Sequence, residues 1–342
     1  MTAYALSELA APGGLPRALH GLAARSPLTF ARRAAEVAWE AGAAAILDRV
    51  APLPAGVTRV EDGRGPRHAG SLALYLHWSP DGRISGMVRR QVALWAAEGF
   101  TVAFVSNAAP PPEDWAAIGA QAALCLARRN TGRDFGAWRD AAVEAVARFG
   151  EPRELLLAND SVLGPFRPLG PLVAAWRAGG EGLFGATESL GGGPHLQSYA
   201  LLARGPQAVG TLRAHLAAYR DSRSKWRVVQ QGELGLAARM RAAGVRQAAL
   251  FGYARLAAAV DDATRASLGP RFADPAALGR YPLNPCHHLW RVLVERMGFP
   301  WLKTELVRRN PGKLPGVEDW PGLMDPADAA LIRAHLALMD GG

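Results

Sequence analysis

Glu154–Ser161 reads ELLLANDS, a compact apolar run that ends in Asn159, Asp160 and Ser161. This pattern is typical of a buried β-strand with a polar carboxyl end. Ligands bind at the carboxyl ends of the strands in an open α/β sheet, so these side chains are predicted to lie at a binding edge. A single carboxylate between two small polar side chains suits a hard cation such as Mg²⁺ or Mn²⁺. An Asx turn has the same composition, and the stretch alone leaves both interpretations open.

Strands and helices alternate on the N-terminal side of this stretch. The sequence predicts a strand over Leu72–Trp78, an amphipathic helix over Ser85–Glu98 and a second strand over Thr101–Ser106. Such a βαβ unit has parallel strands and a right-handed crossover. A third strand over Ala122–Ala127 and a helix that ends at Phe149 continue the alternation. The pattern predicts an α/β fold with a doubly wound, largely parallel sheet.

The remaining segments divide the chain into four parts. Residues 1–50 are predicted as an N-terminal helical segment, 51–70 as a Pro- and Gly-rich linker, 71–320 as the main domain and 321–342 as a C-terminal helix. In the N-terminal segment, helices are expected over Leu15–Ala24 and Leu28–Val50. Trp39, Ile46 and Leu47 are expected to pack on the main domain rather than on a membrane, because the polar face carries both charge signs.

The composition limits the classes of partner. The chain has 342 residues, an apolar fraction of 49% and a formal net charge of +9. This is sufficient for one large α/β domain or two smaller domains, and the basic balance favours anionic partners such as nucleotide phosphates. Nucleic acid is not expected as a partner, because no long basic run or aromatic-rich basic stripe occurs.

The cysteines and the apolar segments indicate the compartment. Cys125 and Cys286 lie far apart, without the spacing of a metal site or a disulfide framework, which suits a reducing cytoplasm. No segment approaches the ~18 apolar residues of a membrane span, and no signal-peptide pattern opens the chain. We therefore expect a cytoplasmic protein, soluble or peripheral on a membrane.

A polar loop between the third strand and the following helix is a candidate anion site. It contains Arg129, Asn130, Gly132, Arg133 and Asp134. Backbone N–H groups at a helix start and two guanidinium groups suit a phosphate, and the carboxylate can accept a hydrogen bond from a base or a ribose hydroxyl. The alternative is that Asp134 only caps the helix and pairs with an arginine.

Other candidates are isolated in the sequence. His77 and Asp81 follow the first strand, where a nucleotide base would lie, although Asp81 also suits a simple turn. Glu233, at the start of a predicted helix, can serve as a general base or can merely compensate the helix dipole. His287 can complete a metal site or can form a structural hydrogen bond. No Gly-x-Ser-x-Gly, Walker A or Gly-x-Gly-x-x-Gly motif points to a hydrolase, a P-loop protein or a dinucleotide-binding protein.

Five segments in chain order, between about residues 70 and 315, resemble those of one family. They are Arg129–Trp138, Asn159–Ser161 with Gly164-Pro165, His195–Tyr199, Gly232–Leu236, and Asn284–Trp290 followed by Gly298–Lys303. Together they resemble the rhamnan synthesis protein F family of bacterial glycosyltransferases. Cys286 departs from the pattern, because a Thr is expected there.

This resemblance implies a GT-A-like fold, a nucleoside-diphosphate-sugar donor such as a dTDP-sugar, and a growing surface polysaccharide as acceptor, lipid-linked or free. It implies an enzyme on the cytoplasmic face of the inner membrane. Asp160 would hold Mg²⁺ or Mn²⁺ with His287, and Glu233 would be the base of an inverting transfer. The donor would contact Arg129, Asn130, Gly132, Arg133, Asp134, Asn159 and Ser161, and the acceptor His195, Gln197 and Tyr199. The position of His77 and Asp81 after the first strand adds these two residues to the donor side. The single carboxylate leaves one alternative, a non-catalytic module that binds glycan or a protein partner.

Overall fold

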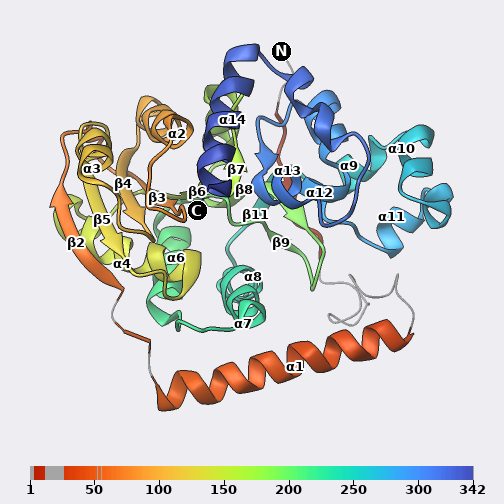
Figure 1. Cartoon of the computed structure of the whole chain (residues 1–342), viewed down its shortest axis with the longest axis horizontal. Helices are drawn as coiled ribbons and strands as arrows, with labels where there is room; N and C mark the ends of the chain where they lie inside the picture. Colours follow the sequence, from red (N-terminus) through yellow and green to blue (C-terminus); the bar gives the residue numbers. More distant parts are fainter. Residues whose placement is uncertain (1–3, 12–26, 52, 55, 342) are drawn as a thin grey trace.

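The computed structural model describes residues 4–11, 27–51, 53–54 and 56–341. Its centre is a mixed β-sheet with helices on both sides (Figure 1). Of the nine strands along the sheet, six run in one direction and β1, β10 and β2 run against them. In spatial order the strands are β1 (Ser7–Glu8), β11 (Gln247–Phe251), β8 (Gly182–Ser189), β10 (Ala200–Arg204), β6 (Glu154–Asn159), β3 (Ser71–His77), β4 (Thr101–Ser106), β5 (Leu124–Arg128) and β2 (Val57–Asp62).

The predicted α/β class and the predicted βαβ unit are confirmed. Strand β3 pairs in parallel with β4 on one side and with β6 on the other. In this register His77 lies beside Ser106, and Leu76 lies beside Asn159. The carboxyl ends of three central strands therefore meet at one edge of the sheet, which is where the sequence predicts a binding site.

Helices cover both faces because successive side chains of a strand point to opposite sides. Ala73 and Tyr75 of β3 belong to the core on one face, whereas Leu72 and Leu74 belong to the core on the other. The first core contains α2 (Gly86–Ala97), α3 (Pro112–Gly119), α5 (Gly170–Ala178) and much of the C-terminal part, and the second contains α4 (Arg133–Phe149), α6 (Pro206–Ala218) and α8 (Gly235–Ala242).

Two strands of five or six residues, β2 and β11, were not expected from the sequence, and neither were the two-residue strands. The predicted linker 51–70 contains β2, which pairs antiparallel with β5 and forms an edge of the sheet. Its residues are mostly polar and exposed, so the apolar alternation of a strand is weak there. Strand β11, by contrast, is fully buried between β1 and β8, and its short apolar run has no distinctive periodicity.

The N-terminal helix α1 (Pro27–Val50) has the predicted extent but lies differently from the prediction. Trp39, Ile46 and Leu47 are 81%, 64% and 48% exposed, so they do not pack on the main domain. Figure 1 shows α1 along the lower side of the molecule, beside α7 (Lys225–Val229). Near the end of α1, Ala44 is buried and Asp48 pairs with Arg223 at 2.7 Å. The helix predicted over 15–24 lies outside the described residues.

The C-terminal part returns to the central edge of the sheet. After α9 (Tyr253–Ala258), α10 (Asp262–Ser267), α11 (Ala277–Arg280) and α12 (Pro285–His288), the strand β12 (Leu302–Lys303) leads into α13 (Thr304–Arg309). The last helix, α14 (Pro326–Asp340), packs on α2, where His335 Nδ1 lies 2.8 Å from Ser85 Oγ. The end of α14 lies close to β3 and β6, because Met339 lines the same cavity as Leu76 and Asn159. Every helix in the described ranges is too short or too polar to cross a bilayer.

Candidate functional site

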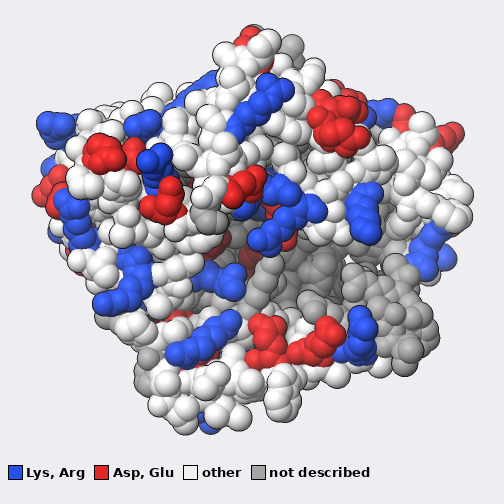
Figure 2. All heavy atoms as spheres, in the orientation of Figure 1, with Lys and Arg blue, Asp and Glu red and all other residues white. Residues whose placement is uncertain are grey.

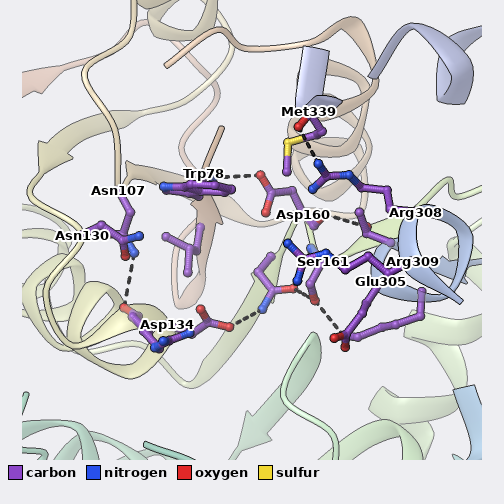
Figure 3. A pocket seen from close by; sticks show the side chains of 15 residues that line it. Trp78, Asn107, Asn130, Asp134, Asp160, Ser161, Glu305, Arg308, Arg309 and Met339 are labelled. Atoms are coloured by element: carbon purple, nitrogen blue, oxygen red, sulfur yellow. Dashed lines mark hydrogen bonds between the residues drawn. The ribbon is translucent and has the colours of Figure 1, made fainter. Parts of the chain in front are cut away.

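A cavity of about 500 Å³ lies at the carboxyl ends of β3 and β6. Figure 2 shows that the molecule is hollowed near the centre of this face, with charged side chains of both signs around the hollow. In Figure 3, Asn107 and Asn130 lie on one side of the cavity, and Glu305, Arg308 and Arg309 lie on the other. The cavity is lined by Leu76, Trp78, Asn107, Asn130, Arg133, Asp134, Asn159, Asp160, Ser161, Lys303, Thr304, Glu305, Arg308, Arg309 and Met339.

Asp160 joins the ends of the two central strands. Its Oδ2 accepts a hydrogen bond of 2.8 Å from the backbone N–H of Trp78, which directly follows β3. Burial raises the pKa of the Asp160 carboxyl to about 7, and the nearby charge of Asp134 acts in the same direction. The Trp78 N–H and the Lys303 ammonium oppose this rise in the pKa. One oxygen of Asp160 is thus committed to the fold.

Asn159 and Ser161 form the Asx turn that the sequence left open. Asn159 Oδ1 accepts from the backbone N of Ser161 at 3.1 Å and from its Oγ at 2.5 Å. Asn159 Nδ2 donates to Asp134 Oδ2 at 2.9 Å, which links β6 to the first turn of α4. The predicted donor residues Asn159, Ser161 and Asp134 are therefore brought together, and all of them line the cavity.

Lys303 enters the same cluster from a distant part of the sequence. Strand β12 pairs antiparallel with β7 (Val162–Leu163), which places Lys303 beside the strand-end motif. Lys303 Nζ donates to Ser161 Oγ at 2.8 Å and lies 4.8 Å from the centre of the Tyr199 ring. The backbone N of Thr304 also donates to the Ser161 carbonyl oxygen, at 3.0 Å. No local pattern predicts this role for Lys303, because 142 positions separate the two side chains.

The loop before α4 depends on a buried arginine that the sequence did not single out. The side chain of Arg128 is fully buried and donates to Asn107 Oδ1 at 2.7 Å and to Asp140 Oδ2 at 3.0 Å. It also donates to the Thr131 carbonyl oxygen at 2.9 Å. Because a buried guanidinium without partners would be costly, these contacts fix the loop. An arginine at a strand end, followed by polar residues, was the only available signal.

Only part of the predicted anion loop faces the cavity. Asn130, Arg133 and Asp134 line it, whereas Arg129 and Gly132 are not among the lining residues. Gly132 has φ +69° and Arg133 has φ +52°, so two successive residues adopt the left-handed conformation. This turn directs the backbone into α4 and leaves the Arg133 side chain exposed at the cavity. Gly132 is therefore a structural residue rather than a ligand-binding one.

Glu233 occupies a different position from the predicted start of a helix. The helical run begins at α7 and continues through a π-helical turn, η1 (Gln230–Leu234), into α8. Glu233 thus lies in the middle of the run, in a helix type that is rare and is often found at functional sites. Its Oε1 accepts from Ser198 N at 2.9 Å and from Ser198 Oγ at 2.7 Å, and its Oε2 lies 3.6 Å from His195 Nε2.

A second, smaller cavity of about 180 Å³ lies in front of Glu233. It is lined by Arg133, Asp134, Phe135, Ser198, Val228, Val229 and Glu233. The two cavities share Arg133 and Asp134. A ligand in the larger cavity and a hydroxyl group in the smaller one can therefore meet at these two residues.

All three predicted acceptor residues are buried, His195 at 5% exposed, and two of them belong to an internal hydrogen-bonded cluster. Gln197 and Tyr199 are 9% and 2% exposed. The Thr187 hydroxyl donates to Gln197 Oε1 at 2.7 Å and lies 2.6 Å from the Tyr199 hydroxyl, and Cys286 Sγ donates to Gln197 Oε1 at 3.2 Å. The Tyr199 ring of this cluster lies 4.8 Å from the Lys303 ammonium. Of the predicted acceptor residues, only His195 lies beside Glu233.

The two residues predicted to contact a base are also corrected. His77 is buried between Ser106 Oγ at 3.0 Å and the Arg83 carbonyl oxygen at 3.1 Å, and burial lowers its pKa to about 3. Asp81 accepts from the backbone N of Arg83 at 3.1 Å and forms a turn away from the cavity. Trp78, which is 38% exposed, lines the cavity instead. A tryptophan directly after a strand was the signal that sequence reasoning missed.

The side chains of the strand-end motif do not fit a divalent metal ion. One Asp160 oxygen is bound by the Trp78 N–H, and Asn159 Oδ1 is bound twice by Ser161. A dication on the Ser161 hydroxyl would lie beside the fixed positive charge of Lys303. His287 has its Nε2 3.9 Å from Glu305 Oε2 and is not a lining residue of the cavity. Within the described ranges, no group of three or more His, Cys, Asp or Glu side chains is arranged to hold a metal.

Comparison with known proteins identifies a distant relative. The uncharacterized protein y4gN of Sinorhizobium fredii (strain NBRC 101917 / NGR234) is 28% identical to this chain over 144 residues. The match covers 41% of this chain and 37% of the relative, so this chain spans well under half of that protein. No protein-family model matches the sequence.

Proposed function

We propose that this chain is a GT-A-like glycosyltransferase that moves a sugar from a nucleoside-diphosphate donor to a hydroxyl group of a saccharide. The observation that carries the proposal is the pair of cavities that meet at Arg133 and Asp134. One cavity has an aromatic ring, amides and cations for a nucleotide, and the other has a carboxylate for an acceptor. The resemblance to the rhamnan synthesis protein F family supports rhamnose or another deoxysugar, a bacterial surface polysaccharide, and a site of action in the cytoplasm at the inner membrane.

The side chains of the larger cavity suit the base, the sugar and the diphosphate of a nucleotide-sugar donor. The partly exposed Trp78 ring offers an apolar face for a base or a sugar, and Asn107 and Asn130 offer hydrogen bonds. Lys303 and Arg133 supply positive charge for a diphosphate. The sugar would then lie near Asp134, where the smaller cavity begins.

The acceptor hydroxyl belongs in the smaller cavity, beside Glu233. In an inverting displacement, Glu233 takes the hydroxyl proton while the hydroxyl oxygen attacks the anomeric carbon. The bond between that carbon and the diphosphate oxygen breaks, and the diphosphate leaves with the electron pair. The hydrogen bonds from Ser198 and the adjacent His195 hold the carboxylate in place for this step.

A Glu233→Gln substitution tests the proposal. The amide keeps the size of the side chain but cannot accept the proton, so turnover should fall by ~10²–10⁴ while donor affinity stays nearly unchanged. The measurement is release of free nucleoside diphosphate from a nucleotide sugar in the presence of a rhamnan-type oligosaccharide acceptor, with calorimetry for donor affinity.

The matched control is Glu318→Gln, which makes the same change at an exposed position outside both cavities. This variant should keep wild-type turnover. Full activity of the Glu233→Gln variant would remove Glu233 as the base. Binding of a glycan without any nucleotide-sugar turnover by the wild type would instead favour the non-catalytic module.

A further inference from the structure

The cations of the larger cavity come from two separate parts of the chain. Arg133 is the first residue of α4, whereas Lys303, Arg308 and Arg309 come from β12 and α13. All four line the same cavity. A GT-A-like enzyme must balance the charge that develops on the leaving diphosphate, and a set of fixed cations can do this as well as a metal ion can.

Lys303 is held where a metal ion would bind the strand-end motif. Its ammonium donates to Ser161 Oγ at 2.8 Å, its strand pairs with β7, and the Tyr199 ring lies under it at 4.8 Å. The Thr304 hydroxyl also donates to the Asp160 carbonyl oxygen at 3.3 Å. These contacts fix the charge before any ligand arrives, so little reorganisation is needed on binding.

The three arginines of the cavity differ in whether other groups of the protein already bind their guanidinium groups. Arg308 donates to the Met339 carbonyl oxygen at 2.5 Å and to Asp340 at 2.8 Å, so it ties α13 to the end of α14. Arg133 and Arg309 are exposed at the cavity, and neither forms an ion pair within the described part of the chain. Their guanidinium groups are suited to bidentate contacts with phosphate oxygens.

We propose that Lys303, together with Arg133 and Arg309, holds the donor diphosphate in place of a divalent metal ion. This inference rests on the proposed function, because the diphosphate is that of the nucleotide sugar. It assigns Lys303 as a residue that contacts the leaving group, and it makes donor binding independent of Mg²⁺ and Mn²⁺.

The test is calorimetric titration of the full chain with dTDP and, separately, with inorganic pyrophosphate. Each titration is done with excess EDTA, with Mg²⁺ and with Mn²⁺. The expected result is the same affinity within about twofold in all three conditions. Lys303→Met, which keeps most of the stem over Tyr199 but removes the charge, should weaken binding of both ligands roughly tenfold or more in each condition, the loss of one charge-assisted contact.

Two further variants control for folding and for overall charge. Lys303→Arg keeps the charge and should retain most of the affinity, whereas a general loss of structure would abolish binding in both Lys303 variants. Arg309→Ala should weaken binding, and Arg32→Ala, which removes one charge from the exposed side of α1, should have no effect. If both alanine variants changed the affinity by the same factor, binding would depend only on the net charge of the protein and not on the cations of the cavity. This result would overturn the inference.

The outcomes separate this inference from the proposed function. If dTDP binds only when Mn²⁺ or Mg²⁺ is present, the inference is overturned, while glycosyl transfer remains possible. If pyrophosphate binds in EDTA with the expected dependence on Lys303 but no nucleotide sugar is turned over, the inference about the cation cluster holds and the proposed function fails. If neither ligand binds in any condition, both are wrong.

Discussion

Gly132 keeps the loop of the larger cavity in place because no side chain fits at its position. Its φ is +69°, and a Cβ atom there would lie 2.0 Å from Asp221 Oδ1. Asp221 in turn pairs with Arg139 at 2.9 Å, and the Tyr219 hydroxyl donates to the Gly132 carbonyl oxygen at 3.0 Å. The residue is thus required by both backbone conformation and close packing.

We therefore expect Gly132→Ala to lower the free energy of unfolding. The left-handed conformation alone costs about 1–2 kcal/mol for an alanine, and displacement of Asp221 adds to this cost. The substitution should also weaken nucleotide binding, because it displaces the neighbouring Arg133. Urea unfolding and calorimetry measure the two effects.

Gly210→Ala is the matched control. Gly210 lies within α6, and apart from its chain neighbours and the adjacent helix backbone no atom lies within 4 Å of an added Cβ. Alanine should therefore stabilise the helix by about 0.5–1 kcal/mol. If Gly132→Ala had the same effect, the clash with Asp221 would not exist in solution.

At the level of single residues, the sequence predicted where the strands end better than it predicted which nearby side chains are accessible to a ligand. Asn159, Asp160 and Ser161 lie at the sheet edge as expected, because an apolar run followed by polar residues is a local pattern. His77 and Gln197 fit equally local patterns but are buried. Their burial depends on packing against distant segments, which a local pattern does not contain.

The helix α1 is held to the rest of the molecule by a polar contact. Asp48 Oδ2 accepts from Ser222 Oγ at 2.8 Å, and its Oδ1 accepts from Arg223 at 2.7 Å. Arg223 also donates to the Ala51 carbonyl oxygen at 2.9 Å. Since Trp39 is 81% exposed, this contact must supply much of the attachment near the end of the helix.

Asp48→Ala should loosen α1 without unfolding the sheet. Loss of a partly buried ion pair and a hydrogen bond costs about 1–2 kcal/mol, so amides of α1 should exchange roughly 5–30 times faster with deuterium. Amides of β3 and β6 should keep their protection. The measurement is hydrogen exchange followed by mass spectrometry.

Arg32→Ala provides the comparison within the same helix. It removes an exposed pair with Glu36 at 3.5 Å, which contributes only about 0.3–0.5 kcal/mol. Exchange in α1 should change little. An equal change in both variants would mean that helix stability, and not attachment through Asp48, controls exchange.

Whole-molecule stability should depend on pH because several histidines are buried as neutral groups. Burial lowers the pKa values of His77, His215 and His335 from 6.5 to about 3, about 4 and about 4. Below pH ~6.5 the unfolded chain binds protons at these sites and the folded chain does not, so stability falls as the pH falls. Each histidine contributes a slope of about 1.4 kcal/mol per pH unit between about pH 6 and 5.

Asp160 has the opposite effect. Its pKa is raised by burial from 3.8 to about 7, so between these values the folded chain keeps a proton that the unfolded chain has released. This carboxyl therefore favours the folded state at lower pH. We expect His335→Gln to flatten the dependence of unfolding free energy on pH, and Asp160→Asn to steepen it, each by about 1.4 kcal/mol per pH unit. Urea unfolding at several pH values tests both signs, and a change of the same sign in both variants would contradict the assignment.

The sequence by itself determined the α/β class, the order of the central strands and helices, and the position of the polar motif at the end of β6. These follow from hydrophobic periodicity and turn residues, which act over a few positions. Only the tertiary structure decided which side chains share the cavity with that motif. The pairing of β12 with β7 brings Lys303 to Ser161 across 142 positions, and the π-helical turn brings Glu233 to Ser198 and His195. Such contacts arise from the packing of distant segments, and this packing places the Lys303 ammonium at the strand end where the sequence predicted a metal ion.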